Sequence, residues 1–423
     1  MKTVRFLSQV ALLLILVAGV TSCGPVKKDN TPEDEPVESE VVSKSGAITA
    51  NETWKAGNEY QLDGKVYVAN GATLTIEAGT KIIGLKKDKK EDTSALIVTA
   101  GSKIMAVGTA DKPIVFTSEH GKDSRWGGLV ILGNAPINQE DRQEIEGIDP
   151  TSTDIPKGVD ITYGGNNAND NSGQLSFVRV EYAGAAIADA NELNSFTFGG
   201  VGKGTKLDHL QAYYGADDSF EFFGGNVNAS YLVSTATNDD AFDFDFGYTG
   251  TITYALSTID PKIGYSKDPN GIECDNDAIP NEITGDKGSN KTPFTRPVLK
   301  YVTIVGTKDG QVAAIENSTK KTLKSGANFR RNCQFDLQNS IIHGFPKGIL
   351  KETENEFVMK NNFVVSAPAG NEFATFSPDP SNQTKSVLAD PYSGKAAGLK
   401  ATVPNTGAFA NSDWLTGEWV IGY

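Results

Sequence analysis

The sequence predicts an all-β protein, a single-stranded right-handed parallel β-helix, and three observations support this fold class. Acids and phenylalanines within residues 217–247 recur at an interval of 22 residues, so that Phe220 returns as Phe242. Apolar and polar residues alternate over short runs, which is the periodicity of a strand. After the first 22 residues, no stretch of ten or more residues keeps a helical pattern. Short strands that repeat at such an interval indicate a solenoid, in which each turn of the coil stacks on the next.

The same interval predicts which side chains stack on one another. It matches residues 71–82 with residues 93–104 and therefore places Leu74 beside Leu96. Matching positions in successive turns would lie about 4.8 Å apart along the axis of the coil. Asn339 is expected in a turn where asparagines stack. Inward-facing stacks are expected for Phe220, Phe222, Phe242, Phe244, Phe246, Leu210 and Leu232.

The N-terminus has the features of a secretion signal. Residues 1–22 contain the basic Lys2 and Arg5, then an apolar run that is too short to span a bilayer comfortably. Small residues precede Cys23, as in the lipobox of bacterial lipoproteins. This similarity implies cleavage before Cys23 and acylation of that cysteine, which would hold the protein on a membrane. Ordinary signal cleavage, with an incidental thiol at Cys23, stays open.

Residues 23–45 are predicted to be an acidic flexible tether, and residues 46–423 a single β-helical domain. The tether is rich in proline and acids and has little to bury. The formal net charge of −14 argues against nucleic acid as a partner and against binding to an anionic lipid surface. The domain contains Cys274 and Cys333, and the sequence does not decide whether these two cysteines pair.

Caps are expected at both ends of the coil, because an open turn exposes apolar groups and strand edges. Residues 46–65, with Trp54 and Tyr60, are predicted to close one end, and the segment with Trp414 and Trp419 the other. Long loops on a solenoid tend to gather on one side and carry recognition. Three such insertions interrupt the repeat, at residues 84–92, 138–173 and 268–297.

Several segments resemble a particular family. GTADKPIVFTSE (108–119), RWGGLVILGNAPI (125–137) and GAFANSDWLTGEWVIGY (407–423) are similar to segments of large β-helical outer-membrane lipoproteins of Bacteroidota. VYVANGATLTIEAGTKI and ADDSFEFFGG fit the same pattern. A few members resemble surface-layer lipoproteins that coat the cell. The resemblance implies an outer-membrane lipoprotein exposed on the cell surface, with a structural or protective role and lateral self-association.

The predicted stacking also creates a row of acids. If the phenylalanines face inward, Glu221 and Asp243 face outward and Glu273 continues their column, with Asp245 and Asp275 beside it. Carboxylates about 4.8 Å apart repel by roughly 0.9 kcal/mol in bulk water. The row must therefore be solvated, partly protonated or neutralised by a cation. Calcium suits a cluster of oxygen ligands, so a calcium site formed by these five residues and a solvated acidic face both stay open.

Two further functions stay open. Tyr213 and Tyr231 are predicted to face outward, where they would stack on the sugar rings of a polysaccharide. Some parallel β-helices are polysaccharide lyases or hydrolases, and the acidic row would then supply the carboxylates. No motif ties a base to these acids, so catalysis is the less favoured hypothesis. The candidate bases are Arg179, Lys262, Arg330 and Arg331.

Overall fold

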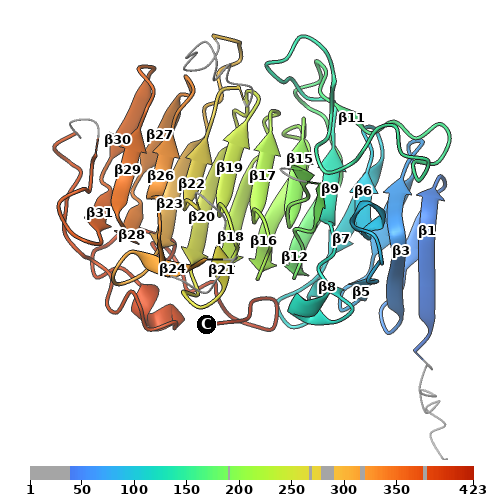
Figure 1. Cartoon of the computed structure of the whole chain (residues 1–423), viewed down its shortest axis with the longest axis horizontal. Helices are drawn as coiled ribbons and strands as arrows, with labels where there is room; N and C mark the ends of the chain where they lie inside the picture. Colours follow the sequence, from blue (N-terminus) through green and yellow to red (C-terminus); the bar gives the residue numbers. More distant parts are fainter. Residues whose placement is uncertain (1–38, 189–190, 266–268, 278–289, 315–319, 375–378) are drawn as a thin grey trace, which may run out of the picture. The chain divides into compact units, whose positions relative to one another are not determined.

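The fold is a parallel β-helix, as predicted, in a computed structural model that describes residues 39–188, 191–265, 269–277, 290–314, 320–374 and 379–423. A sheet of 24 strands winds into a coil whose turns lie side by side from β1 to β31 (Figure 1). Within these ranges, no helix has the length and apolarity needed to cross a membrane. The signal segment and Cys23 lie outside the described residues, so their roles stay predictions.

Three faces run along the coil, and strands of successive turns pair in parallel on each face. The first face contains β1 (Val41–Ile48), β3 (Glu59–Val68), β5 (Lys81–Gly84), β8 (Ile114–Ser118), β12 (Gly173–Glu181), β16 (Lys206–Tyr213), β18 (Ala229–Thr235), β20 (Thr251–Thr258), β23 (Val298–Val305), β28 (Ile341–Phe345) and β31 (Phe363–Ser366). The second contains the ends of β1 and β3, then β6 (Ala95–Val98), β9 (Gly128–Leu132), β15 (Phe196–Gly199), β17 (Phe220–Phe223), β19 (Phe242–Asp245), β22 (Ile272–Cys274), β26 (Ser325–Phe329) and β29 (Lys347–Lys351). The third contains β2 (Glu52–Trp54), β4 (Thr73–Ile76), β7 (Lys103–Val107), the starts of β12, β16, β18, β20 and β23, then β27 (Phe335–Gln338) and β30 (Phe357–Lys360).

Short elements lie outside this coil. The strands are β10 (Gln143–Glu144), β11 (Thr162–Tyr163), β13 (Ala186–Ala188), β14 (Asn191–Glu192), β21 (Gly264–Tyr265), β24 (Gln311–Ala314) and β25 (Lys320–Thr322). Three 3-10 helices are described, at Lys90–Asp92, Gly121–Asp123 and Ala396–Leu399.

The predicted stacks form the core inside the coil. Phe220 pairs in register with Phe242, 22 residues later, and their ring centroids lie 5.5 Å apart with planes at 9°. Leu210 pairs with Leu232 at the same interval. The predicted asparagine stack also forms, since Asn361 Nδ2 donates to Asn339 Oδ1 at 3.2 Å. Identical positions of successive turns therefore lie over one another.

Two predicted stacking positions are wrong. Leu74 pairs with Ile104 on the third face, whereas Leu96 lies on the second face beside Val66. The insertion 84–92 lengthens this turn, and the two similar segments are successive strand pairs of the coil rather than equivalent positions. Phe246 does not point inward either: it follows the end of β19 with a positive φ of 48° and packs on Phe223 outside the coil.

The start of the domain lies earlier than predicted. β1 begins at Val41 and pairs with β3 from Glu59 onward, so residues 41–45 belong to the sheet rather than to the tether. Backbone pairing orders this edge strand although much of it is exposed. Trp54 and Tyr60 are buried and stack at 4.8 Å within the first turn, which agrees with their expected place at this end.

The predicted C-terminal cap is wrong, because Trp414 and Trp419 lie along the side of the coil. Residues 404–423, here the C-terminal strap, run back over turns formed much earlier in the chain. Gly407 N donates to the carbonyl of Asn339, whereas Trp419 N donates to the carbonyl of Ala110. Residues 371–374 and 379–383 lie at the end instead, where Phe373 makes a parallel bridge to Ile349 and Gln383 makes one to Phe363. Indole burial drives this placement, since Trp419 is 0 % exposed.

The strap packs on a ladder of aromatic rings at the bend between the third and first faces. Neighbouring rings stack with centroids 4.3 to 5.2 Å apart. All five backbones have left-handed φ angles between 51° and 61°, so the bend itself aims each ring outward. The ladder consists of Phe177, His209, Tyr231, Tyr254 and Tyr301.

Two of the three insertions meet, as their gathering on one side predicts. Gln139 of the insertion 138–173 donates from Nε2 to Asp277 Oδ1 at 3.4 Å. It also accepts at Oε1 from Lys291 Nζ at 2.6 Å. Asp277 and Lys291 belong to the insertion 268–297. The insertion 268–297 itself contains β22. Residues 138–173 after β9, and the described residues 275–277 and 290–297 after β22, leave the same edge of the coil (Figure 1).

Candidate functional site: the acidic column

The outer side of the second face carries a column of polar side chains in its central turns. Strand pairing places Glu221 beside Asp243, and Asp243 beside Glu273. The predicted alignment of these three acids is confirmed. The column extends to Thr197 before Glu221 and to Asn328 after Glu273. Residues that alternate with these five point into the coil and belong to its hydrophobic core. We call these five residues the acidic column.

The acidic column is buried except at Asp243, which is half-buried, so a fully solvated acidic face, one of the two readings left open, does not describe it. Glu221 is 7 % exposed and Glu273 is 8 % exposed. The insertion 138–173 covers this side of the sheet and contributes Glu146. Asn194 Nδ2 donates to both Glu146 Oε1 and Glu221 Oε2, and so joins the insertion to the column. Strand alternation alone could not predict this cover, because the covering residues come from a different turn.

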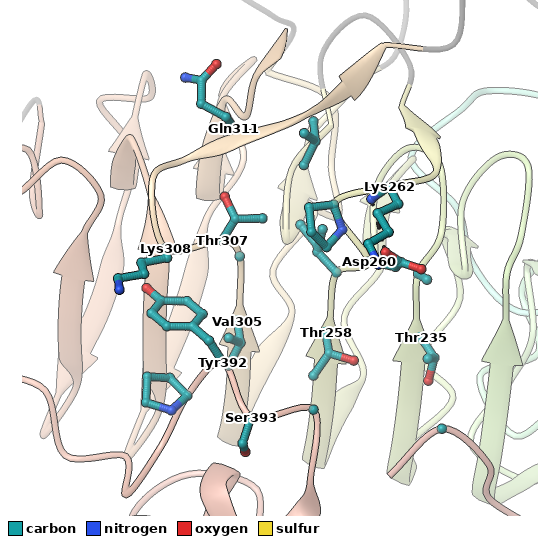
Figure 2. A pocket seen from close by; sticks show the side chains of 18 of the residues that line it. Thr235, Thr258, Asp260, Lys262, Val305, Thr307, Lys308, Gln311, Tyr392 and Ser393 are labelled. Atoms are coloured by element: carbon teal, nitrogen blue, oxygen red, sulfur yellow. Dashed lines mark hydrogen bonds between the residues drawn. The ribbon is translucent and has the colours of Figure 1, made fainter. Parts of the chain in front are cut away.

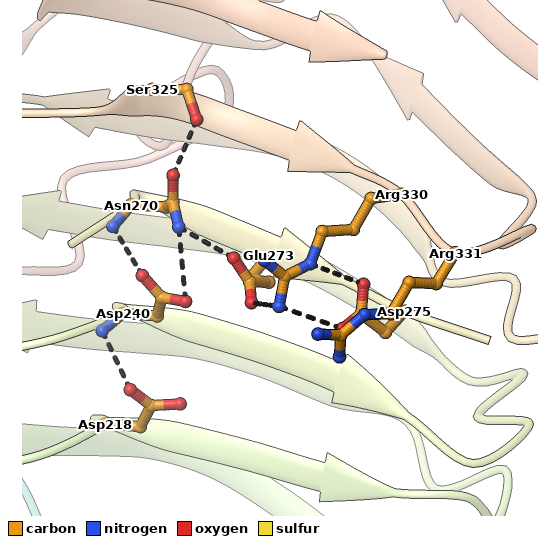
Figure 3. A network of polar contacts seen from close by, with 8 residues as sticks. All are labelled: Asp218, Asp240, Asn270, Glu273, Asp275, Ser325, Arg330 and Arg331. Atoms are coloured by element: carbon orange, nitrogen blue, oxygen red, sulfur yellow. Dashed lines mark hydrogen bonds and ion pairs between the residues drawn. The ribbon is translucent and has the colours of Figure 1, made fainter. Parts of the chain in front are cut away.

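A hydrogen-bonded chain of acids lies in the turn just before the column. Asp218 Oδ1 accepts from the backbone N of Asp240 at 2.8 Å, and Asp240 Oδ1 accepts from the backbone N of Asn270 (Figure 3). Asn270 Nδ2 donates to Glu273 Oε1 at 2.8 Å, and Asn270 Oδ1 accepts from Ser325 Oγ at 2.6 Å. One side chain per turn thus links four turns of the coil.

Two arginines neutralise the C-terminal end of the acid row. The backbone N of Asp275 donates to the carbonyl of Phe244, and the Asp275 carboxylate accepts from Arg330 Nε at 2.8 Å and from Arg331 Nη1 at 2.6 Å. Arg330 also forms an ion pair with Glu273 (Figure 3). Each arginine serves here as a counter-charge to buried carboxylates, so its guanidinium group is engaged in ion pairs rather than free to act as a catalytic base.

The remaining acids have strongly perturbed protonation. Burial raises the pKa of Glu146 to about 6 and that of Glu273 to about 7, with Arg330 opposing the shift at Glu273. Burial, followed by repulsion from neighbouring carboxylates, raises the pKa of Glu221 well above its usual range. The same two causes raise the pKa of Asp243 and of Asp245 well above the usual range. At each of these acids a backbone hydrogen bond and an arginine partly lower the pKa again. The site therefore favours a bound proton or cation.

Two carboxylate sets have the geometry to hold a metal ion. Their ligand atoms lie within 4.8 Å of one another. Four of the predicted ligands, Glu221, Asp245, Glu273 and Asp275, lie outside both sets, whereas Asp243 belongs to one. The sets are Asp217, Asp218 and Asp239, and Asp218, Asp240 and Asp243. The predicted ligand set omits Asp217, Asp218, Asp239 and Asp240. The sequence signal for these acids is their own 22-residue repeat, in which Asp218 recurs as Asp240.

Polar atoms without partners among the described residues occur along the acidic column, at Thr197 beside Glu221, at Asn328 beside Glu273, and at Asp243. Thr197 and Asn328 are both 0 % exposed. Within the described residues, Thr197 Oγ1, both amide atoms of Asn328, and Asp243 Oδ1 have no hydrogen-bond partner. Buried polar groups are nearly always paired, so these atoms indicate that water or an ion completes the site. The carboxylate oxygens of the two sets are the kind of donor that a hard cation takes.

The two predicted sugar-stacking tyrosines lie in different surroundings. Tyr231 belongs to the aromatic ladder, stacked on His209 at 4.4 Å and met edge-on by Trp414 of the strap. Its ring faces are therefore occupied, and the prediction of a free platform is wrong there. Tyr213 instead lines a pocket at the end of β16. The candidate base Lys262 lines that pocket too, whereas Arg179 is paired with Glu181 at 2.6 Å.

Residues 46–419 match the family model of a pectate-lyase-like beta helix domain. Among curated proteins and solved structures, none matches this chain.

Proposed function

The chain belongs to the family of pectate-lyase-like β-helix domains. On that premise we propose that it is a structural protein of the cell surface, whose coil is stabilised by calcium held between Asp243 of the acidic column and Asp218 and Asp240 of the turn before it. The observation that carries the proposal is the cluster of Asp218, Asp240 and Asp243, whose carboxylate oxygens lie within 4.8 Å of one another. Asp218 and Asp240 are buried, and Asp243 Oδ1 has no hydrogen-bond partner among the described residues. A buried carboxylate without a counter-charge is costly, and a divalent cation removes that cost.

The chemistry of the donors favours calcium. Calcium takes six to eight oxygen ligands in flexible geometry, from carboxylates, carbonyls and water. Asp218, Asp240 and Asp243 would hold the ion, since their carboxylate oxygens lie within 4.8 Å of one another. These acids belong to two successive turns, so the bound ion would tie the turns together.

The same burial argues for a structural role over catalysis. A lyase or glycosidase needs carboxylates that a sugar chain can reach. Here Glu221 is covered by the insertion 138–173, and Glu273 is paired with Arg330. The signal segment and Cys23 favour anchoring to the outer membrane by lipid. The paired insertions 138–173 and 268–297 offer a surface for lateral contact within a surface-layer-like coat.

Thermal unfolding with and without calcium tests the cation. Calcium at about 100 times its Kd would stabilise the protein by roughly 2.7 kcal/mol, and a chelator would reverse that gain. Asp243→Asn should abolish the response to calcium, whereas Asp63→Asn, at an exposed acid paired with Lys87, should keep it. An unchanged melting temperature on adding calcium to chelated protein would refute the site.

Two measurements test the role at the cell surface. A coat protein should be abundant in outer-membrane fractions and should assemble laterally on a lipid monolayer. Incubation with acidic polysaccharides should produce no new reducing ends or unsaturated products. Product formation that Glu221→Gln abolishes would instead establish an enzyme.

A further inference from the structure

A second site lies at the corner that follows the first face, away from the strand positions of the acidic column. A pocket of about 910 Å³ opens at the ends of β18, β20 and β23 (Figure 2). The loops that follow these strands form one wall, and residues 391–394 form another. The strap reaches it with Tyr423, whose hydroxyl lies 2.7 Å from Thr258 Oγ1. Ligand sites commonly have this size and this mixture of apolar and polar lining.

Aromatic rings at the pocket are held in place by their hydroxyls. Tyr392 is 38 % exposed, and its hydroxyl lies 2.9 Å from His343 Nδ1. Burial lowers the pKa of His343 to about 4, so at neutral pH its Nδ1 can accept this hydrogen bond. Tyr214 donates to Asp260 Oδ2 at 2.7 Å. Rings fixed at their polar ends leave apolar faces, which suit the C–H faces of a sugar ring.

Cationic side chains outnumber carboxylate side chains at the pocket, which is lined by Lys262, Lys308 and Lys320 against Asp260 and Asp309. The Asp260 carboxylate already accepts from Tyr214 and from the backbone N of Lys262. Asp309 pairs with Lys320 at 3.3 Å. Within the described residues, no ion pair occupies Lys262 or Lys308, and Lys308 lies beside Tyr392 (Figure 2). Two unpaired lysines at one pocket, in a protein with net charge −14, select an anion.

A buried hydroxyl in the same wall lacks a partner. Thr307 is 6 % exposed, and its Oγ1 has no hydrogen-bond partner among the described residues. Its side chain lies between Lys308 and Asp260 at the pocket (Figure 2). A buried polar atom of this kind is satisfied by a ligand or by water. A ligand hydroxyl that reached this atom would therefore gain a hydrogen bond that the described residues do not supply.

We propose that this pocket binds a negatively charged saccharide, with the apolar sugar face on Tyr392 and the anionic group on Lys262 and Lys308. Stacking, an unpartnered hydroxyl and unpaired ammonium groups together match a ligand that has an apolar face, hydroxyls and a negative charge. Carboxylate and sulfate share this chemistry. The site uses none of the acidic column, so it stands independently of the calcium proposal.

Calorimetric titration with matched dextran fragments tests the pocket. Carboxymethyl-dextran, dextran sulfate and plain dextran of equal length share one backbone and differ in charge. At least one charged fragment should bind saturably, about tenfold more tightly than plain dextran, and the tighter of the two identifies the anionic group. Equal affinity for plain dextran, or no binding of any fragment, would overturn the proposal.

Variants locate the binding. Lys262→Gln with Lys308→Gln should weaken binding of the charged fragment about tenfold, and Tyr392→Ala should weaken binding of charged and plain fragments alike. Lys347→Gln, at an exposed lysine away from the pocket, is the matched control and should bind as the parent does. Unaltered melting temperatures exclude misfolding as the cause. Full affinity of the double lysine variant for the charged fragment would show that other residues bind the anionic group. Asp243→Asn should bind the charged fragment as the parent does, which separates this site from the calcium site.

Discussion

Asp243 and Glu273 lie side by side in register on β19 and β22, yet their surroundings differ in charge. Glu273 forms an ion pair with Arg330, whereas Asp243 Oδ1 has no hydrogen-bond partner within the described residues. The acid row thus passes from an end with direct arginine ion pairs to Asp218, Asp240 and Asp243, for which no ion pair is described. This asymmetry places the cation requirement at Asp243 and the acids near it.

The protein without cations should become less stable as pH rises from about 6.5 to about 8. Burial raises the folded-state pKa of Glu146 to about 6 and that of Glu273 to about 7, above the values of an unfolded chain. The folded state then binds more protons, so its stabilisation is complete below the unfolded pKa and is lost as pH rises through the folded pKa.

Chemical denaturation in chelator across this pH window measures the effect. The contribution of His343 to stability has the opposite pH dependence. Burial lowers the pKa of His343 to about 4, so its contribution is lost as pH falls below about 6.5. The window therefore begins above the titration of His343. Saturating calcium should flatten the pH dependence. Stability that rises with pH in chelator would contradict the assigned shifts.

Arg330→Gln should destabilise the protein by about 3 kcal/mol or more. It removes the counter-charge from Glu273 and Asp275, whose side chains are 11 % and 5 % exposed. The matched control is Arg296→Gln, which breaks ion pairs with Asp336 and with the exposed Glu356, and should cost about 1 kcal/mol or less. Urea denaturation of both variants compares them, and equal losses would show that the buried pair has no special weight.

The fold could be predicted because stacking leaves a direct trace in the sequence. Phe220 and Phe242 belong to turns without insertions, so the interval in the sequence equals one turn of the coil. Leu74 and Leu96 obey the same interval, but the insertion 84–92 makes their turn longer, and they lie on different faces. A repeat therefore fixes the architecture, whereas the register of each turn depends on where the loops enter.

The sequence predicts that the acids of the acidic column align on one side of the sheet, but it does not predict which residues cover or neutralise them. Alternation with inward phenylalanines places Glu221, Asp243 and Glu273 on one side. Its cover comes from the insertion 138–173, and its counter-charge Arg330 lies 55 residues from Asp275. Neither relationship follows any period of the sequence. The strap is missed for the same reason, since Trp419 packs on Phe177, which lies far earlier in the chain.

Trp419→Ala should cost roughly 3 to 5 kcal/mol and loosen the C-terminal strap. The indole is 0 % exposed and meets the rings of Phe177 and His209 edge-on. Arg179 holds the strap from the other side through the carbonyls of residues 418 and 419. Limited proteolysis should then cut within residues 404–423. The control Tyr392→Ala, at a ring that is 38 % exposed, should lower the free energy of unfolding far less. If the strap of Trp419→Ala is cleaved no faster than that of the parent, Trp419 does not hold the strap in place.

Cys274 and Cys333 should be inert to thiol reagents in the folded protein and should react on unfolding. Both are free and fully buried in the core of the coil, and burial, followed by the neighbouring Cys333 thiol, raises the pKa of Cys274 well above its usual range. Because the thiolate is the reactive species, labelling by a chromogenic disulfide should follow global unfolding in urea. Mass spectrometry under non-reducing conditions should find both thiols unpaired. Rapid labelling in buffer would show that this part of the coil opens locally, and a mass lower by two hydrogens would show that the two sulfurs pair.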